Sequence, residues 1–298
     1  MLTVDPVTTM LRPAPVVTAD LVEATVPAPE SLRPWLTEFG WVPTVRDLSE
    51  SFTHLPQAEI TIVLRADVPG ARDALVIGPQ TKAFYAHPSK PAGCTRLRLA
   101  PGSARPLLGV PASVLTDRVV RLAELPGAVA DLADELADLD ADEVFPFLEN
   151  VLPQRISEDA TQRAQRDLLR SAVLTISSDP AGRSVQSLAA DLAVSERQLR
   201  NLFTAGVGVS PKHFARIDRV RRVLAQAETI AWGQPDSPKH HARTETPPLS
   251  LAQLAADNGY FDQSHMTADF RTLMGVPPTS FLRGTLPTPT PCRPLDRI

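Results

Sequence analysis

Leu188-Ala189-Ala190-Asp191 recurs in this chain as Leu254-Ala255-Ala256-Asp257. Later residues match as well: Phe203 with Phe270, Gly208-Val209 with Gly275-Val276, Pro211 with Pro278, and Phe214 with Phe281. The tetrads lie 66 residues apart and the later matches lie 67 apart, so one residue has been added where the second copy reads Asn258-Gly259-Tyr260-Phe261. An internal repeat indicates one structural unit used twice, and an insertion confined to one place suggests a turn between two helices.

Each copy is predicted to form a helix, a tight turn and a second helix. In the first copy, Ser184 and Ser195 are the predicted N-caps, because a serine hydroxyl can accept hydrogen bonds from the first free backbone N–H groups. In the second copy the predicted caps are Ser250 and Asp262, and Gly259 supplies the backbone freedom that a tight turn needs. Apolar residues recur between these caps at helical spacing: Val185, Leu188, Ala189, Leu192, Leu199, Leu202, Phe203, Leu251, Leu254, Ala255, Met266 and Phe270.

Two short helices joined by a tight turn, the second with polar residues at its start, are typical of a helix-turn-helix. In DNA-binding proteins the second helix enters the major groove, where Arg bonds guanine and Gln or Asn bonds adenine. The predicted base-reading residues are Glu196, Arg197, Gln198, Arg200, Asn201, Gln263, Ser264, His265, Thr267 and Arg271. The alternative is a pair of helical hairpins in an unrelated all-α protein, but two copies in register favour DNA binding.

The segment between the two copies is predicted to be one long helix. Pro211 suits the first turn of this helix, which then extends to about Ala227. It carries more arginines than its apolar stripe can hold, so we expect some of them to meet DNA phosphates, which fix register without reading sequence. The predicted phosphate contacts are Ser195, Arg216, Arg219, Arg221 and Arg222, and a solvated basic face is the alternative for each arginine.

Charge is unevenly distributed along the chain. The net charge of the 298 residues is −4, which taken alone argues against a nucleic-acid binder. Residues 1–160 carry 13 basic and 22 acidic side chains, whereas residues 161–298 carry 17 basic and 12 acidic ones. The basic excess lies within 161–228, with 11 basic against 6 acidic side chains. Such asymmetry points to nucleic-acid or membrane contact, and chance segregation of a few charges is the alternative.

The second half resembles the AraC/XylS family of bacterial transcription regulators. The matching residues are Leu188-Ala189-Ala190-Asp191, Ser195-Glu196-Arg197-Gln198-Leu199, Leu202-Phe203, Gly208-Val209-Ser210-Pro211, Arg216, Arg219, Leu254-Ala255, Gly259-Tyr260, Asp262-Gln263-Ser264-His265, Phe270, Gly275-Val276 and Pro278. The resemblance covers residues 161–284. It implies seven helices, with the long central helix holding two helix-turn-helix units whose recognition helices enter successive major-groove segments.

The chain departs from the family pattern in three places. Met266 and Ala268 stand where the family usually has an aromatic residue and an arginine, so we expect the second unit to bind its half-site more weakly. The link at residues 230–248 is longer than the usual connector, and its prolines predict a flexible surface loop. Its adjacent His240 and His241 suit such a loop better than a metal site. Residues 285–298 are predicted to be a disordered tail.

Residues 1–160 are predicted to be a separate sensing or self-association domain. Strands are expected at Val16-Val17, Leu21-Val22, 60–64, 74–77 and 96–99, followed by helices around 107–109, 113–116 and 128–143. This order suggests an α+β domain, or a small β barrel with a helical tail. This half resembles the N-terminal domain of one subset of these regulators through Leu55-Pro56, Gly78-Pro79-Gln80-Thr81, Leu97-Arg98-Leu99, Pro101-Gly102, Leu107-Leu108-Gly109 and Leu115-Thr116-Asp117-Arg118.

No enzymatic activity, cofactor or metal site is predicted. His54, His87, Cys94 and Asp117 are candidate reactive groups, but they show no recognisable catalytic spacing. Cys94 could be a redox-sensing thiol, although a buried structural cysteine is the commoner case. Alkyl-accepting repair relatives need several cysteines, and this chain has 2. Neither a signal peptide nor a membrane span is evident, so a cytoplasmic protein, associated with the nucleoid when bound to DNA, is expected.

The sequence therefore predicts an α+β domain followed by an all-α domain with two helix-turn-helix motifs, in a DNA-binding transcription regulator. Expected partners are double-stranded DNA, RNA polymerase, a second copy of the chain and a small-molecule effector of unknown identity. The alternatives are a ligand-independent architectural DNA-binding protein, and an enzyme or DNA-repair protein that uses the repeat only to reach DNA.

Overall fold

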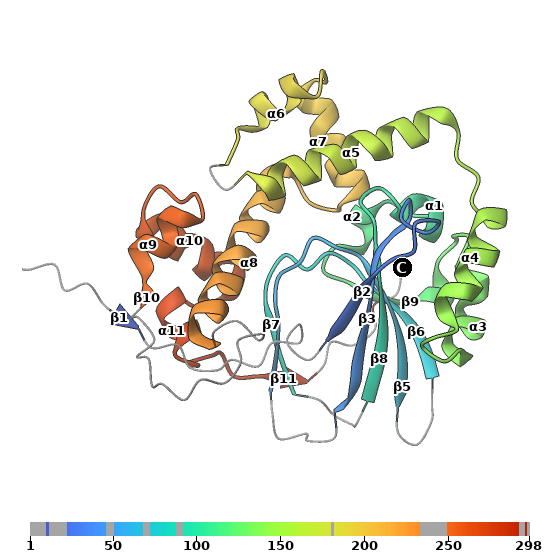
Figure 1. Cartoon of the computed structure of the whole chain (residues 1–298), viewed down its shortest axis with the longest axis horizontal. Helices are drawn as coiled ribbons and strands as arrows, with labels where there is room; N and C mark the ends of the chain where they lie inside the picture. Colours follow the sequence, from blue (N-terminus) through green and yellow to red (C-terminus); the bar gives the residue numbers. More distant parts are fainter. Residues whose placement is uncertain are drawn as a thin grey trace, which may run out of the picture.

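The computed structural model describes residues 10–11, 23–45, 51–67, 72–87, 92–179, 182–232, 249–291 and 296. A sheet with four covering helices forms what we call the sheet domain, and the helices that follow form the helical domain (Figure 1). This arrangement confirms the predicted fold class, an α+β domain followed by an all-α domain. No helix in these ranges is both long enough and apolar enough to cross a membrane.

The sheet domain is built on a six-stranded antiparallel sheet. Its strand order is β2-β3-β8-β5-β6-β9. The strands are β2 (Ala24–Pro27), β3 (Leu36–Val45), β5 (Thr61–Asp67), β6 (Arg72–Ile77), β8 (Ala92–Leu99) and β9 (Val119–Arg121). The strand order begins at β2 and ends at β9, so the sheet is open. Of the two predicted alternatives, an α+β domain and a small β barrel with a helical tail, the structure shows the α+β domain. β4 (Phe52–His54) and β7 (Phe84–His87) form a separate antiparallel pair.

Four helices cover the sheet and share its core. They are α1 (Ala104–Leu108), α2 (Ala112–Leu115), α3 (Ala133–Asp138) and α4 (Val144–Arg155). The expected helical run over 128–143 is interrupted, because Leu139 is extended (φ −71°, ψ 146°) and α4 begins only at Val144. Leu132 and Leu136 pack into the core of the sheet domain, so this apolar face is covered by its own domain.

The helical domain contains seven helices within the described ranges, the number that the family resemblance implies. They are α5 (Ala160–Ser178), α6 (Val185–Asp191), α7 (Glu196–Gly206), α8 (Pro211–Trp232), α9 (Leu251–Asp257), α10 (Gln263–Met274) and α11 (Pro278–Leu282). Asp159 caps α5 in a reciprocal capping box with Gln162. α8 lies between the α6–α7 pair and the α9–α10 pair, as Figure 1 shows.

Several expectations about the chain's loops and ends need correction. Residues 230–232 belong to α8, so the long link begins later than predicted, and 233–248 lie outside the described residues. The expected strands at Val16-Val17 and Leu21-Val22 also lie outside them. Within the tail predicted to be disordered, β11 (Thr290–Pro291) pairs in parallel with β7. A further two-residue pair joins β1 (Met10–Leu11) to β10 (Leu249–Ser250).

Candidate nucleic-acid interface

The first helix-turn-helix is formed by α6 and α7. The hydroxyl of Ser184 accepts from the backbone N–H of Ser187 over 3.0 Å, and that of Ser195 accepts from Gln198 over 3.1 Å. The turn between the helices places Ala193 at φ 54°, an unusual conformation for a residue with a side chain. Both predicted caps are confirmed, and the turn orients α7 so that Phe203 is fully buried.

The second helix-turn-helix, formed by α9 and α10, has the same construction. Ser250 accepts from the backbone N–H of Gln253 over 3.3 Å, and Asp262 accepts from that of His265 over 2.7 Å. Gly259 takes the turn position that Ala193 has in the first unit, with φ 72°. Phe270 is fully buried in the core of this unit, as Phe203 is in the first. The two copies of the repeat are therefore two copies of one structure.

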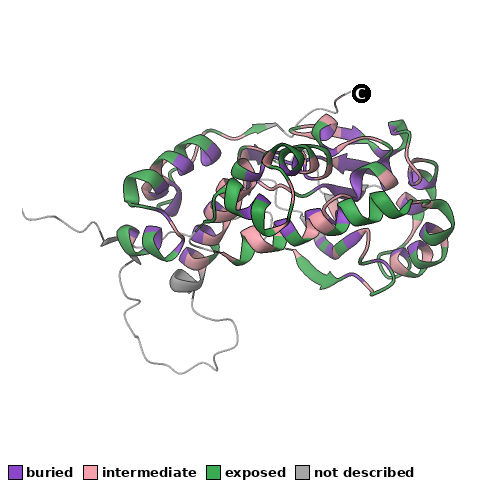
Figure 2. Cartoon of the chain, turned by 90° about the horizontal axis from the view of Figure 1, so that it is seen from above, coloured by how far each residue is buried: buried purple, intermediate pink, exposed green. Residues whose placement is uncertain are grey.

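The predicted base-reading side chains point mainly to solvent. Eight of the ten are exposed, and Glu196 and Thr267 are half-exposed. Arg200 forms an ion pair with Glu196 one turn earlier and keeps 57% of its side chain exposed. The hydroxyl of Thr267 donates to the carbonyl oxygen of Gln263 over 2.8 Å. Figure 2 shows buried residues on one side of the helices and exposed residues on the other. Base reading by these residues stays a prediction.

The arginines of α8 have partners within the chain. Arg216 and Arg219 approach the carboxylate of Asp269, on α10, at 2.7 and 3.5 Å. Asp269 is only 4% exposed. The guanidinium of Arg219 also lies 5.0 Å from the ring centroid of Tyr260, a cation–π arrangement. These contacts hold α10 against α8, so the two arginines have a structural task besides the predicted phosphate contact.

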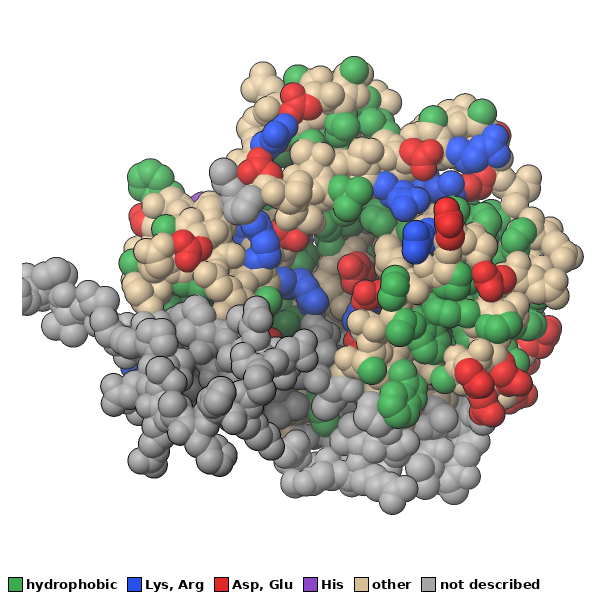
Figure 3. Space-filling model, in the orientation of Figure 1, with side chains coloured by type: hydrophobic (Ala, Val, Ile, Leu, Met, Phe, Trp, Pro, Cys, Tyr) green, Lys and Arg blue, Asp and Glu red, His purple; other side chains and the backbone are tan. Residues whose placement is uncertain are grey.

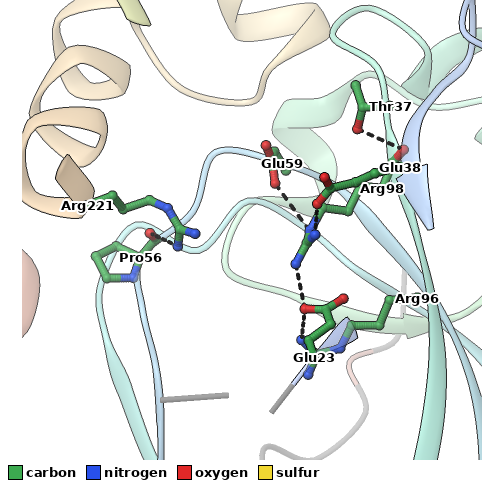
Figure 4. Close-up of polar contacts among 8 residues, drawn as sticks. All are labelled: Glu23, Thr37, Glu38, Pro56, Glu59, Arg96, Arg98 and Arg221. Atoms are coloured by element: carbon green, nitrogen blue, oxygen red, sulfur yellow. Dashed lines mark hydrogen bonds and ion pairs between the residues drawn. The ribbon is translucent and has the colours of Figure 1, made fainter. Parts of the chain in front are cut away.

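Arg221 and Arg222 also make contacts within the chain. Arg222 lies 3.0 Å from Asp218, and burial raises the pKa of the Asp218 carboxyl. Arg221 donates to the carbonyl oxygen of Pro56 in the sheet domain over 3.4 Å (Figure 4). The hydroxyl of Ser195 already accepts the capping hydrogen bond. Phosphate binding by Ser195 and the four α8 arginines therefore stays a prediction.

The two domains touch through close backbone approaches at the end of α7. The N–H of Gly102 donates to the carbonyl oxygen of Gly206 over 3.0 Å. The hydroxyl of Thr116 donates to the carbonyl oxygen of Gly208 over 2.9 Å. A Cβ added to Gly208 would lie 2.8 Å from both Thr116 and Pro79, so no room for a side chain exists there.

The sheet domain also completes the core of the second helix-turn-helix. Leu55 and Tyr85 belong to the same buried cluster as Phe270 and Met274. The backbone N–H of Ala83 donates to the carbonyl oxygen of Leu273 over 2.7 Å. Both helix-turn-helix units therefore contact the sheet domain.

A cavity of about 310 Å³ lies between the domains. Its apolar walls include Ile60 and Leu99 from the sheet domain and Val173, Phe214 and Ile217 from α5 and α8. Polar groups at its edge are Glu59, Arg170, Asp218 and Arg221.

A cluster of charges lies beside this cavity. Arg98 pairs with Glu23 at 2.6 Å, with Glu59 at 3.5 Å and with Glu38, as Figure 4 shows. Arg98 is only 8% exposed, and Arg96 shares Glu23 with it at 3.1 Å, so three carboxylates compensate two guanidinium groups. The cluster joins β3 and β8 to the residues that precede β2 and β5, next to the interface between the domains.

The charge asymmetry of the sequence is visible on the surface. Acidic side chains gather over α3 and α4, whereas basic side chains lie near α8 and α5 (Figure 3).

The candidate reactive groups lie on different elements: His54 on β4, His87 on β7, Cys94 on β8 and Asp117 between α2 and β9. His54 stacks on Phe84 at 6.2 Å between ring centroids. Asp117 accepts hydrogen bonds from the backbone N–H and hydroxyl of Thr81, at 2.8 and 2.6 Å. Burial raises the pKa of the Cys94 thiol, which opposes the reactive thiolate of a redox sensor. The described part of the chain contains no group of three or more His, Cys, Asp or Glu side chains that could hold a metal ion.

Sequence reasoning missed Asp269, Tyr85 and Phe261. Asp269 interrupts the apolar pattern of α10 as a buried carboxylate, and its partners lie on a helix some 50 residues earlier. The residues around Tyr85 in the sequence do not indicate its contact with α10. Phe261 lies in the stretch to which the one-residue insertion was assigned, so the repeat alignment could have found it.

A family model matches only part of the sheet domain, whereas the similar solved structures span most of the chain. Residues 24–121 match the family model described as a domain of unknown function, DUF6597. No curated protein matches the chain. Among solved structures, ToxT from Vibrio cholerae is similar with a TM-score of 0.39 and 11% identity, covering 82% of this chain and 97% of ToxT. ToxT with a bound unsaturated fatty acid has a TM-score of 0.39 and 10% identity, covering 80% and 92% of the two chains.

Proposed function

We propose that this protein is a sequence-specific DNA-binding transcription regulator of the AraC/XylS type. One observation carries the proposal: two helix-turn-helix units, alike in caps, turn and core, each expose polar side chains at the start of the second helix. These side chains include guanidinium, amide and imidazole groups, which can bond base edges in the major groove. The basic excess of residues 161–228 would draw the chain to the phosphate backbone.

The test is selection of bound duplexes from random DNA with the full chain, followed by affinity measurements. We expect the selected duplex to bind about a thousandfold more tightly than a scrambled duplex of the same composition, and its affinity to fall steeply with salt. Equal affinity for both duplexes would favour the architectural alternative. If the chain bound no duplex at any ionic strength, the proposal would be contradicted.

We further propose that a small-molecule effector binds in the cavity between the domains. Cavities of this size with apolar walls and a few polar groups are typical ligand sites, and they occur often at domain interfaces. A ligand there would touch α5, α8 and the end of α7, and so would alter how the first helix-turn-helix is held. Leu174→Trp places a large side chain at the edge of this cavity. A metabolite that raises the unfolding temperature of the unaltered chain should not raise that of L174W, and an equal rise in both would place its site elsewhere.

A further inference from the structure

Phe261 is almost completely exposed. With 94% of its surface accessible, it is the most exposed large hydrophobic residue in the described part of the chain. The next, Leu174 on α5, is 67% exposed. Single exposed apolar residues are common, but one at the start of a recognition helix lies where DNA would bind.

The turn of the second unit is one residue longer than the turn of the first, and Phe261 is the additional residue. The N–H of Val194 donates to Ala189, and the N–H of Tyr260, 66 residues later, donates to Ala255, both over 3.0 Å. The next element in each copy is the N-cap, Ser195 or Asp262, and these lie 67 residues apart. Val194 therefore corresponds to Tyr260, and Ser195 to Asp262. Phe261 stands between them without a counterpart.

Both neighbours of Phe261 are fixed in place. Tyr260 is 5% exposed, and its ring meets the ring of His265 edge to face, at 5.4 Å between centroids. The carboxylate of Asp262 caps α10 through the N–H of His265. The backbone is therefore held on both sides of the exposed Phe261, which precedes the exposed Gln263 and Ser264 at the start of α10.

The chemistry of the major groove limits what a phenyl ring can recognise there. Phe has no hydrogen-bond donor or acceptor on its side chain, and the apolar group that a base presents in the major groove is the 5-methyl of thymine. We propose that Phe261 reads a thymine through contact with this methyl group, next to the base pairs that α10 contacts. The inference rests on the proposed function, and it adds a preference for the thymine methyl group to the base contacts of the polar side chains.

The test uses the full chain and a duplex that it has selected. Each thymine is replaced in turn by uracil, which keeps the hydrogen-bonding groups and lacks the methyl group. We expect one of these replacements to weaken binding of the unaltered chain about fourfold, the loss of affinity expected when one methyl group is no longer buried. The same replacement should leave binding by Phe261→Ala unchanged. Phe261→Ala should bind the thymine duplex about tenfold more weakly. Its salt dependence should equal that of the unaltered chain, since Phe neutralises no phosphate.

Val26→Ala is the matched control, because Val26 is an apolar residue on β2 that is 52% exposed. This variant should behave as the unaltered chain in every measurement, and the unfolding temperature of Phe261→Ala should be unchanged because the side chain packs against so little. If the chain binds the duplex but no uracil replacement weakens binding, the assignment of Phe261 to a thymine is overturned. The same follows if a replacement weakens binding by Phe261→Ala equally. Neither result contradicts the proposed function. A chain that retains no duplex overturns the proposed function as well.

Discussion

The hydroxyl of Tyr85, on β7 of the sheet domain, donates a hydrogen bond to the carbonyl oxygen of Met274, the last residue of α10, over 2.7 Å. This bond joins the sheet domain to the recognition helix of the second unit. The Tyr85 ring lies in the same buried cluster as Met274 and Leu55. The second helix-turn-helix therefore depends on the sheet domain for part of its core.

Tyr85→Phe should reduce the free energy of unfolding of the full chain by about 1 kcal/mol, because the buried carbonyl of Met274 loses its donor. Urea denaturation measures this change. Tyr260→Phe is the control, since the buried hydroxyl of Tyr260 has no hydrogen-bond partner in the described part of the chain. If both variants lost the same stability, the bond between Tyr85 and Met274 would not be the cause.

Stability should also fall at alkaline pH. Burial raises the pKa of Tyr85 to about 12, whereas an unfolded tyrosine ionises near 10. The unfolded chain therefore releases this proton first, so the contribution of Tyr85 is complete below about pH 10 and is lost as the pH rises toward 12. Denaturation midpoints measured between pH 9 and 12 should fall less steeply for Tyr85→Phe than for the unaltered chain, and parallel curves would contradict this assignment.

Gly208 and Gly275 offer a matched test of the contact between the domains, because they are corresponding residues of the repeat. Both have positive φ, 90° and 73°, but a Cβ on Gly275 would meet nothing within 4 Å. Gly275→Ala should cost about 1 kcal/mol through backbone strain alone. Gly208→Ala should cost about 2–4 kcal/mol, because its Cβ would also collide with Pro79 and Thr116. Equal losses in denaturation would mean that the domains separate easily at this point.

Asp269→Asn should reduce the free energy of unfolding by about 3 kcal/mol, because it leaves the guanidinium groups of Arg216 and Arg219 without their carboxylate. Asp257→Asn, at an exposed position on α9 where the carboxylate accepts from Gln226 and Gln253, removes the same charge and should cost less than about 1 kcal/mol, because water can replace these bonds. A loss in Asp269→Asn no larger than in Asp257→Asn would show that the buried pair does not hold α10 on α8.

Arg200→Ala should weaken binding to the selected duplex by about 1–3 kcal/mol and relax the preference at one base pair. Arg155→Ala, on α4 of the sheet domain, removes the same charge away from the proposed interface and is the control. Fluorescence anisotropy with duplexes altered at single positions measures both effects. Unchanged affinity and unchanged preference would remove Arg200 from the base-reading set.

The strands of the sheet domain were harder to predict than the helices. β5 and β6 contain apolar runs and β8 contains an alternation of Arg and Leu, so all three are predicted from the sequence, whereas β3 is not. β3 contains Gly40 and Pro43, which normally argue against a strand interior. Its register with β8 shifts between Val42 and Val45, so an irregularity accommodates the proline region. Such an irregularity depends on the neighbouring strand, which a local pattern does not reveal.

The amino-acid sequence by itself determined the two helix-turn-helix units, their four N-caps and their exposed polar faces. These features depend on residues within a few turns of one another, so capping residues and helical spacing suffice to predict them. Only the tertiary structure decided how the units are held. Asp269 meets Arg216 across 53 residues and Tyr85 meets Met274 across 189. Contacts over such separations carry no local signal, because the first forms only when α10 packs on α8, and the second only when the two domains pack together.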